Sequence, residues 1–433
     1  PRLFLVWFGP LFCKVKALHP DTIKEVLKVT DHKPLGFGGG YQGLRLWLGN
    51  GLLLSQGDLW SRNRRLLTPS FHFDILRRYV DIMNLTVNTF LDILTSHNEG
   101  SPVEIYSTIS HLTLDTMLRC AFSYDTNCQL QGEKNEYLKT IKSLTETVLD
   151  RYWKPWLFFD WIHRFSNNYK RIKKGSDYIN RIADEVIVQR KQALQKEADL
   201  DKVRHRDFLD VLLTARDETG GGLSDVQIRD EVNTFLFEGH DTTASGIAWA
   251  LYCLAEHPEY QKKCQDEIDG VLSGRTTDDI EFSDLSGLNF LTLCLKESIR
   301  LYSPVPYIER QLTSDVTLDG YVLPAGTIMT LELYWMHRSQ SVWKDATEYK
   351  PERFQAENVT GSDTYAYLPF SAGKRNCIGQ NFAMQELKIV VARTLRKFDL
   401  NVVKDKKAEP ERYLICRPKN GMYVSLSKRR VIY

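Results

Sequence analysis

The feature that most constrains the fold is a long, mostly apolar stretch that begins at Ser224. Ser224 and Gln227 match the capping box, in which the two side chains satisfy unpaired backbone N–H groups at the start of a helix. The sequence stays compatible with a helix as far as Glu256, where His257 and Pro258 follow. Such a helix has about 30 residues and, at roughly 1.5 Å per residue, a length of about 45 Å. Its apolar residues include Val232, Phe235, Leu236, Phe237, Ile247, Trp249 and Leu251. We therefore expect this helix to cross the core of a large domain.

Further helical patterns and a few short strands complete the predicted architecture. Pro258 suits the first position of a helix over residues 259–272. Helical patterns also cover residues 288–301, which end before Pro304, and residues from Gly379 to about Phe398. Strand patterns are short and lie at residues 311–313, 316–318, 321–323, 327–330 and 423–426. Asp319-Gly320 separates two of them and is typical of a hairpin turn. We predict a mainly α fold with a small β region, and 433 residues allow two or three average domains or one large one.

Charge argues against nucleic-acid binding, and hydropathy argues against a membrane span within residues 1–433. Lysine and arginine total 57 and the acidic residues 55, so the net charge of +2 lacks the basic excess that nucleic-acid binding needs. The longest apolar run, residues 3–13, is about half as long as a membrane span and is interrupted by Gly9-Pro10. Because the chain begins with Pro1 rather than Met, we expect that a leader or anchor preceded it. The charged residues of 170–207 predict either a solvated helix face or a docking surface for an acidic partner.

One of the eight cysteines lies in a segment that predicts chemistry. The cysteines form no C-x-x-C pair, which favours reduced thiols in a cytosol-facing protein. Cys377 is surrounded by Phe370, Gly373, Arg375 and Gly379, and a helix is predicted directly after it. The N-terminus of that helix is expected to lower the pKa of the thiol, and a thiolate is a ligand of haem iron. The glycines would let the backbone pass close to a flat macrocycle. The alternative is a buried cysteine in a turn.

The complete pattern F-x-x-G-x-R-x-C-x-G, from Phe370 to Gly379, resembles the haem-binding signature of the cytochrome P-450 superfamily. Glu297 and Arg300 are similar to the family's E-x-x-R pair, whose spacing places both on one helix face. Arg353, in a P-E-R-F segment, matches the arginine that joins this pair in a buried network. The resemblance implies a structural role for all three, and removal of one charge should be costly.

Four residues resemble the family's partners of the haem propionates. Trp60 and Arg64 match its W-x-x-x-R motif, and bidentate pairing with a carboxylate explains the use of arginine. Arg310 and Arg375 resemble the other propionate partners. The motifs occur in the family's order along nearly the whole chain. The resemblance implies one mainly helical cytochrome P-450 domain over residues 1–433, with haem b between two long helices.

Polar residues in the middle of the long helix require a reason, because burying them is costly. Asp241 and Thr242 resemble the family's acid–alcohol pair, which relays the protons that dioxygen cleavage consumes. Gly239 is expected to let the helix bulge and make room for dioxygen. Glu238 lies four residues before Thr242 and should face the same side. The surrounding run resembles family four of the cytochromes P-450, in which the matching glutamate can form an ester with a haem methyl. Asn233 departs from the aspartate usual there, which leaves the subfamily in doubt.

The resemblance implies a haem-thiolate monooxygenase that inserts one atom of O2 into a C–H bond of a fatty acid or related lipid, preferably at the ω position. Its electrons would come from NADPH through NADPH–cytochrome P-450 reductase, with cytochrome b5 as a further partner. The expected location is the cytosolic face of the endoplasmic reticulum membrane. Two alternatives are a hydroperoxide isomerase or dehydratase of the same fold and a haem-binding sensor without turnover. Neither needs the acid–alcohol pair that Asp241 and Thr242 represent.

Overall fold

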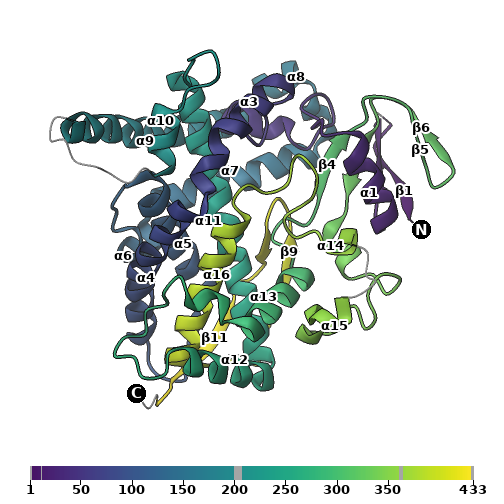
Figure 1. Cartoon of the computed structure of the whole chain (residues 1–433). Helices are drawn as coiled ribbons and strands as arrows, with labels where there is room; N and C mark the ends of the chain where they lie inside the picture. The colour runs from purple at the N-terminus through teal and green to yellow at the C-terminus, as the bar shows by residue number, and fades with distance from the viewer. Residues whose placement is uncertain (1, 11, 199–206, 360–363, 431–433) are drawn as a thin grey trace.

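The long helix runs through the middle of the molecule (Figure 1). The computed structural model describes residues 2–10, 12–198, 207–359 and 364–430. In it, helix α11 covers Asp225–Glu256, and Ser224 and Gln227 form both hydrogen bonds of the predicted capping box. Ile247 and Trp249 are fully buried. The prediction of a long core helix with this cap is therefore confirmed.

The predicted bulge at Gly239 is wrong, because α11 is helical from end to end. Gly239 serves a different purpose. A Cβ atom at this position would lie 2.6 Å from the sulfur of Met117 on α5 (Ile105–Phe122), much closer than real Cβ atoms approach. The glycine therefore permits the close packing of α5 against α11, a prominent helix pair of the structure.

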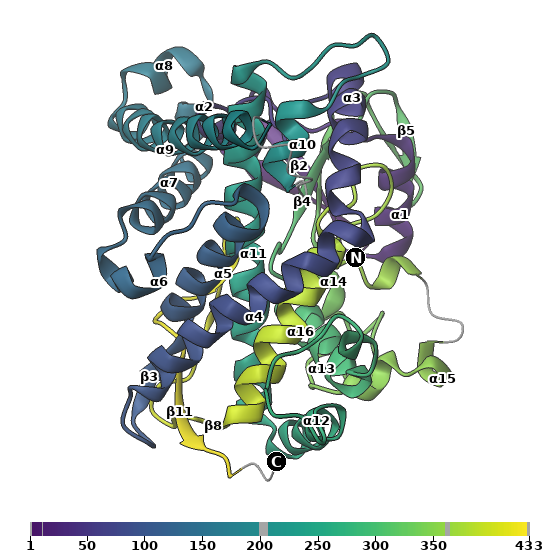
Figure 2. The same cartoon turned by 60° about the vertical axis from the view of Figure 1, so that its left-hand side comes forward.

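The other predicted helices are also present, with bounds that differ from the predictions by no more than one residue. They are α12 (Pro258–Val271), α13 (Asn289–Leu301) and α16 (Gln380–Lys397), and all three pack against α11. Helix α4 (Phe73–Thr95) crosses in front of α16 and α5 in Figure 2. The remaining helices are α1 (Pro20–Val29), α2 (Arg45–Leu48), α3 (Gly57–Leu67), α6 (Cys128–Gln131), α7 (Glu136–Trp153), α8 (Asp160–Phe165), α9 (Asn167–Ala198), α10 (Phe208–Thr214), α14 (Leu333–His337) and α15 (Ala356–Val359).

The strands form small sheets beside the helices. The largest has the order β1-β2-β7-β4 and consists of β1 (Leu3–Phe8), β2 (Phe12–Ala17), β7 (Ile328–Leu331) and β4 (Ile308–Gln311). The apolar run at residues 3–13, which had no predicted structure, thus contributes to a strand hairpin. The strand predicted at residues 311–313 lies earlier, because β4 ends at Gln311.

The predicted hairpin turn is confirmed between β5 (Val316–Leu318) and β6 (Tyr321–Leu323). Asp319 and Gly320 have φ angles of 48° and 82°, as a type I′ turn requires. The C-terminal strand pattern is β11 (Tyr423–Lys428), which lies between β3 (Pro102–Glu104) and β8 (Phe398–Val402). The last pair is β9 (Pro410–Arg412) with β10 (Cys416–Pro418). The prediction of a mainly α fold with a small β region is confirmed.

Helix α9 accounts for most of the charged segment at residues 170–207. Its buried side includes Ile172, Ile179 and Ala183, while Lys173 pairs with Asp177 on the exposed side. This is the solvated helix face of the first interpretation; residues 199–206 lie outside the described part of the chain. Of the helices that the structure describes, none combines the length and the apolar character needed to traverse a lipid bilayer.

Candidate functional site

A cavity of about 300 Å³ lies beside α11 and collects most of the predicted site residues. Its walls come from α11, from β4 and from the segment that precedes α16. The predicted residues that line it are Trp60, Arg64, Glu238, Thr242, Arg310, Phe370, Arg375, Cys377 and Gly379. Much of the remaining lining is apolar and includes Leu44, Leu53, Phe71, Phe235 and Phe237. The cavity thus combines a thiol, cationic groups and an apolar chamber.

A tight turn presents Cys377 to the cavity. The Cys377 N–H donates to the Phe370 carbonyl over 2.9 Å, and the Asn376 N–H donates to the Gly373 carbonyl over 3.1 Å. Gly373 has a φ angle of 72°, a conformation in which a side chain is strained, so the signature glycine is needed for the turn itself. Gly379 is the N-cap residue of α16, which begins directly after this turn.

The protonation of Cys377 differs from the prediction. Burial, aided by the nearby Glu238 carboxylate, raises the pKa of the thiol to about 11, although the Gly379 N–H and Arg64 act in the opposite direction. The Cys377 residue is itself solvent-accessible, because its side chain opens onto the cavity. The start of α16 does lower this pKa through the Gly379 N–H, as predicted, but the effect of burial is larger, so the predicted preference for thiolate is not found in the protein alone. A coordinated metal ion deprotonates a thiol outright, so the thiolate would form on metal binding.

Three arginines beside the cavity lack an anionic partner. Arg64 donates to Asn376, Arg375 donates to the Ser55 carbonyl over 2.8 Å, and Arg310 donates to the carbonyl of its preceding residue over 2.9 Å. Within the described ranges, no carboxylate forms an ion pair with any of the three, and the Nε atoms of Arg310 and Arg375 are buried without a partner. The Arg375 guanidinium lies 4.2 Å from the Trp60 ring centroid. A cofactor with two carboxylates and a soft metal fits these groups and Cys377, and haem has both.

Glu238 and Thr242 share the cavity face of α11, as their spacing predicts. The Thr242 hydroxyl donates to the Glu238 carbonyl over 2.6 Å, so its oxygen can still accept a hydrogen bond, and Thr242 lines the cavity. Burial raises the pKa of Glu238 to about 7, and the Lys33 ammonium opposes this shift. Lys33 is buried and lines the same cavity. The sequence reasoning missed it, because a single lysine before a proline carries no motif.

Asp241 lies apart from the cavity. Its carboxylate is buried and pairs with Arg417 of β10, and Asp241 is not among the described residues that line the cavity. The structure therefore brings Thr242 and Glu238 together, but it leaves the Asp241 carboxylate on another side of α11. Arg417 lies 176 residues away in the sequence, so no local signal could reveal this partner.

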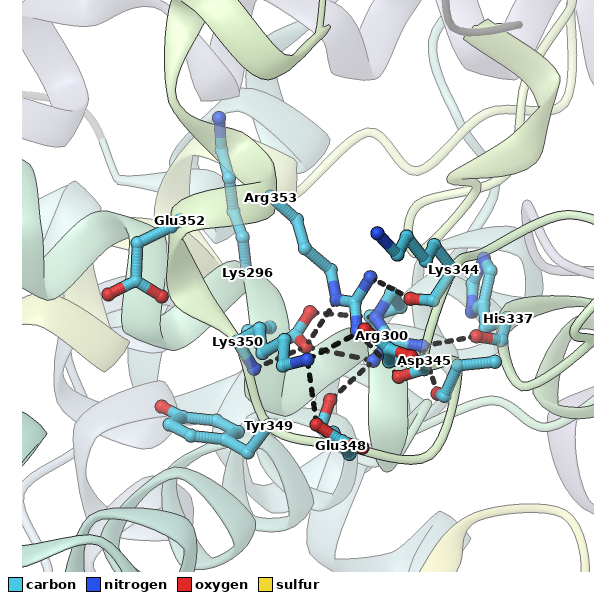
Figure 3. Close-up of polar contacts among 12 residues, drawn as sticks. Lys296, Arg300, His337, Lys344, Asp345, Glu348, Tyr349, Lys350, Glu352 and Arg353 are labelled. Carbon is cyan, nitrogen blue, oxygen red and sulfur yellow. Dashed lines mark hydrogen bonds and ion pairs between the residues drawn. The ribbon is translucent and has the colours of Figure 1, made fainter.

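The three-residue network predicted around Glu297 is present, and Figure 3 shows its contacts. Arg300 donates from Nε and Nη2 to the Glu297 carboxylate over 2.7 and 2.8 Å, and Arg353 Nε donates to it over 3.1 Å. The Lys350 N–H adds a fourth bond to the same carboxylate over 2.8 Å. Glu297 and Arg300 are fully buried. Arg300 also donates to the Ala346 carbonyl over 2.7 Å, so the network joins α13 to the loop between α14 and α15.

Asn233, the departure from the family's aspartate, has a neutral partner. Its side-chain amide donates to the Asn180 side chain of α9 over 2.7 Å. A neutral residue at position 233 therefore suits the neutral residue across from it.

Comparison with known proteins gives a consistent result. The family model for cytochrome P-450 matches residues 3–425. The chain is 43% identical to the human ultra-long-chain fatty acid omega-hydroxylase, over 98% of this chain and 81% of that protein. It is 41% identical to the mouse leukotriene-B4 omega-hydroxylase 3, over 98% of this chain and 82% of that protein.

Proposed function

This chain belongs to the cytochrome P-450 family, and from that premise we propose that it hydroxylates a fatty acid or related lipid at its terminal methyl group. As a family member it is a haem-thiolate monooxygenase that receives electrons from NADPH through a reductase. The observation that carries the proposal is the single cavity in which Cys377, the unpaired arginines, Thr242 and an apolar lining meet. The two named relatives, both omega-hydroxylases, support the position of attack.

Different residues of the cavity would bind the haem, position a proton donor and exclude water. Bound haem supplies the activation of dioxygen. Cys377 would hold its iron, while Arg64, Arg310 and Arg375 would neutralise its carboxylates by charge-assisted hydrogen bonds. The Thr242 hydroxyl can accept a hydrogen bond from a water molecule while it donates to the Glu238 carbonyl. It can therefore hold that water in place as a proton donor. The apolar side chains around them exclude bulk water from the reacting C–H bond.

Attack at the ω position requires a geometric constraint from the protein. Internal C–H bonds of an alkyl chain are weaker than those of the terminal methyl, so attack at the end must be enforced by geometry. Phe235 and Phe237 on α11 line the same chamber as Glu238 and Thr242. We propose that Glu238 also forms an ester with a haem methyl, which would stiffen this wall. Glu238 would supply the carboxylate oxygen of this bond to the methyl carbon, and bound haem would supply the two-electron oxidation that the bond requires.

We propose that the protein attaches to a membrane surface, because large apolar side chains are exposed on two adjoining segments. One is the β1–β2 hairpin; the other joins α7 to α9, and Phe12 and Phe158 hold them together with ring centroids 5.2 Å apart. Trp7 on the hairpin and Trp161 and Phe165 on α8 are more than half exposed. Tryptophan is favoured where one side meets lipid and the other water. We propose attachment to the cytosolic face of the endoplasmic reticulum, with cytochrome b5 as a second electron donor.

Binding to vesicles tests the membrane proposal. Trp161→Glu and Phe165→Glu should reduce sedimentation of the protein with phosphatidylcholine vesicles. Leu130→Glu, at an equally exposed apolar position on α6, is the matched control and should leave sedimentation unchanged. Equal binding by all three variants would contradict the assignment of this surface.

Product analysis tests the proposed reaction. Purified protein with reductase, NADPH and saturated or unsaturated fatty acids should give alcohols at the terminal carbon, identified by carbon-resolved mass spectrometry. Conversion of a lipid hydroperoxide without NADPH would instead indicate an isomerase or dehydratase. Substrate binding with no NADPH consumption would indicate a sensor. Hydroxylation at internal carbons alone would refute the ω assignment but would still support a monooxygenase activity.

A further inference from the structure

Two cysteines that the proposed reaction does not use lie in contact in the core. Cys264 on α12 and Cys294 on α13 have their sulfur atoms 3.5 Å apart, and both residues are fully buried. They are separated by 30 positions in the sequence, so their contact results from the packing of two neighbouring helices. The pair lies outside the cavity that holds Cys377.

The register between these helices is fixed by an independent contact. The Glu267 carboxylate of α12 accepts the Phe290 and Leu291 N–H groups at the start of α13, over 2.6 and 2.9 Å. Cys264 lies three residues before Glu267, and Cys294 lies three residues after Leu291. Residues three apart share a helix face, so the helices run antiparallel here and the cap keeps the two sulfurs opposite each other.

We propose that Cys264 and Cys294 form a modification site, in which hydrogen peroxide oxidises the two thiols to a disulfide that crosslinks α12 and α13. A disulfide needs a sulfur–sulfur distance of about 2.05 Å, so the sulfurs must approach by about 1.5 Å. The Tyr349 hydroxyl and the Ser298 hydroxyl both donate to the Cys294 carbonyl over 2.9 Å, which holds the backbone there. The approach therefore comes from rotation of the two side chains.

The reaction balances with peroxide as the only oxidant. The Cys264 sulfur attacks one peroxide oxygen, the O–O bond breaks, and a sulfenic acid and one water form. The Cys294 sulfur then attacks the Cys264 sulfur, the S–S bond forms, and the sulfenic oxygen leaves as a second water. Two thiols lose two electrons and two protons, and one peroxide becomes two waters. The hydrogen bond to Cys294, together with burial, raises the pKa of the Cys264 thiol, so the first attack should be slow.

Peptide mapping of the full-length holoenzyme tests the proposal. The protein is treated with hydrogen peroxide, the excess is destroyed with catalase, and free thiols are alkylated during denaturation. Mass spectrometry should find a crosslinked peptide that contains Cys264 and Cys294, and dithiothreitol should release it. Cys264→Ala should abolish this peptide and leave Cys294 alkylated. Cys128→Ala is the matched control, because the Cys128 sulfur is also buried but faces the His111 carbonyl, and it should leave the crosslink unchanged.

The midpoint of thermal unfolding is a second measurement, which distinguishes a disulfide that stabilises the native fold from one that destabilises it. A crosslink within the native packing should raise the midpoint of unfolding of wild type, and dithiothreitol should reverse the rise. The Cys264→Ala variant should show no such rise after peroxide. Full alkylation of both cysteines after peroxide exposure that oxidises the partly exposed Met384 would overturn the proposal. So would a crosslink that lowers the midpoint, because the native packing would then not accommodate the disulfide.

Discussion

Removal of the Glu297 carboxylate should destabilise the protein more than removal of any exposed acidic residue. Glu297 accepts four hydrogen bonds, three of them from the guanidinium groups of Arg300 and Arg353. In Glu297→Ala, Arg300 stays fully buried with its charge uncompensated. Breaking a buried pair in this way costs about 3–5 kcal/mol, since the remaining charge has lost both its partner and its water.

The expected change in melting temperature follows from the length of the chain. An unfolding entropy of about 2.1 cal/mol/K per residue gives about 0.9 kcal/mol/K for 433 residues. A loss of about 3–5 kcal/mol then lowers the midpoint by about 3–6 °C. Because the network ties α13 to the loop between α14 and α15, upstream of Cys377, we also expect Glu297→Ala to lose haem during purification.

Circular dichroism during heating and the ratio of haem to protein measure the two effects. Glu25→Ala is the matched control: Glu25 and Lys28 have the same spacing as Glu297 and Arg300, but their side chains are about half exposed. This control should melt like wild type and keep its haem. A Glu297→Ala protein with wild-type haem content and melting temperature would refute the assigned role of the buried network.

Three further predictions concern the cavity. Reduced wild-type protein with carbon monoxide should show the red-shifted absorption band of thiolate-bound haem, and Cys377→Ala should lack it; a variant that keeps the band would disprove the ligand assignment. Thr242→Ala should consume NADPH but release peroxide in place of alcohol, whereas Thr242→Ser should keep the wild-type ratio of alcohol formed to NADPH consumed. The same ratio in both variants would exclude the hydroxyl from proton delivery. In denaturing chromatography with mass detection, haem should travel with wild-type polypeptide and dissociate from Glu238→Ala, and complete dissociation from wild type after many turnovers would exclude the ester.

Local hydrogen bonding explains which elements could be predicted from the sequence. Ser224 and Gln227 satisfy each other's backbone across three residues, so the start of α11 depends on adjacent positions alone. The turn at Asp319-Gly320 is also local, because it depends on two φ angles. The parallel pairing of β2 with β7, more than 300 residues later, could not be predicted, because no local pattern indicates it.

The candidate site could be predicted as a set of residues but not as an electrostatic environment. The spacing of Glu238 and Thr242 correctly places both on one side of α11. The pKa of Cys377 could not be predicted, because burial by distant segments outweighs the local effect of the helix start. The pairing of Asp241 with Arg417 likewise depends on the final packing of β10 against α11.

The unpaired arginines couple cofactor loading to folding. Arg64, Arg310 and Arg375 bring three positive charges to one cavity, and among the described residues none of them forms an ion pair with a carboxylate, so an acquired anion would add compensation that these charges lack. Their mutual repulsion opposes folding until that anion arrives, whereas a ligand that binds only the folded state stabilises it by mass action. The supply of haem during synthesis should therefore set how much folded protein a cell accumulates. In a haem-poor host the same gene would yield less protein, with no change in its sequence.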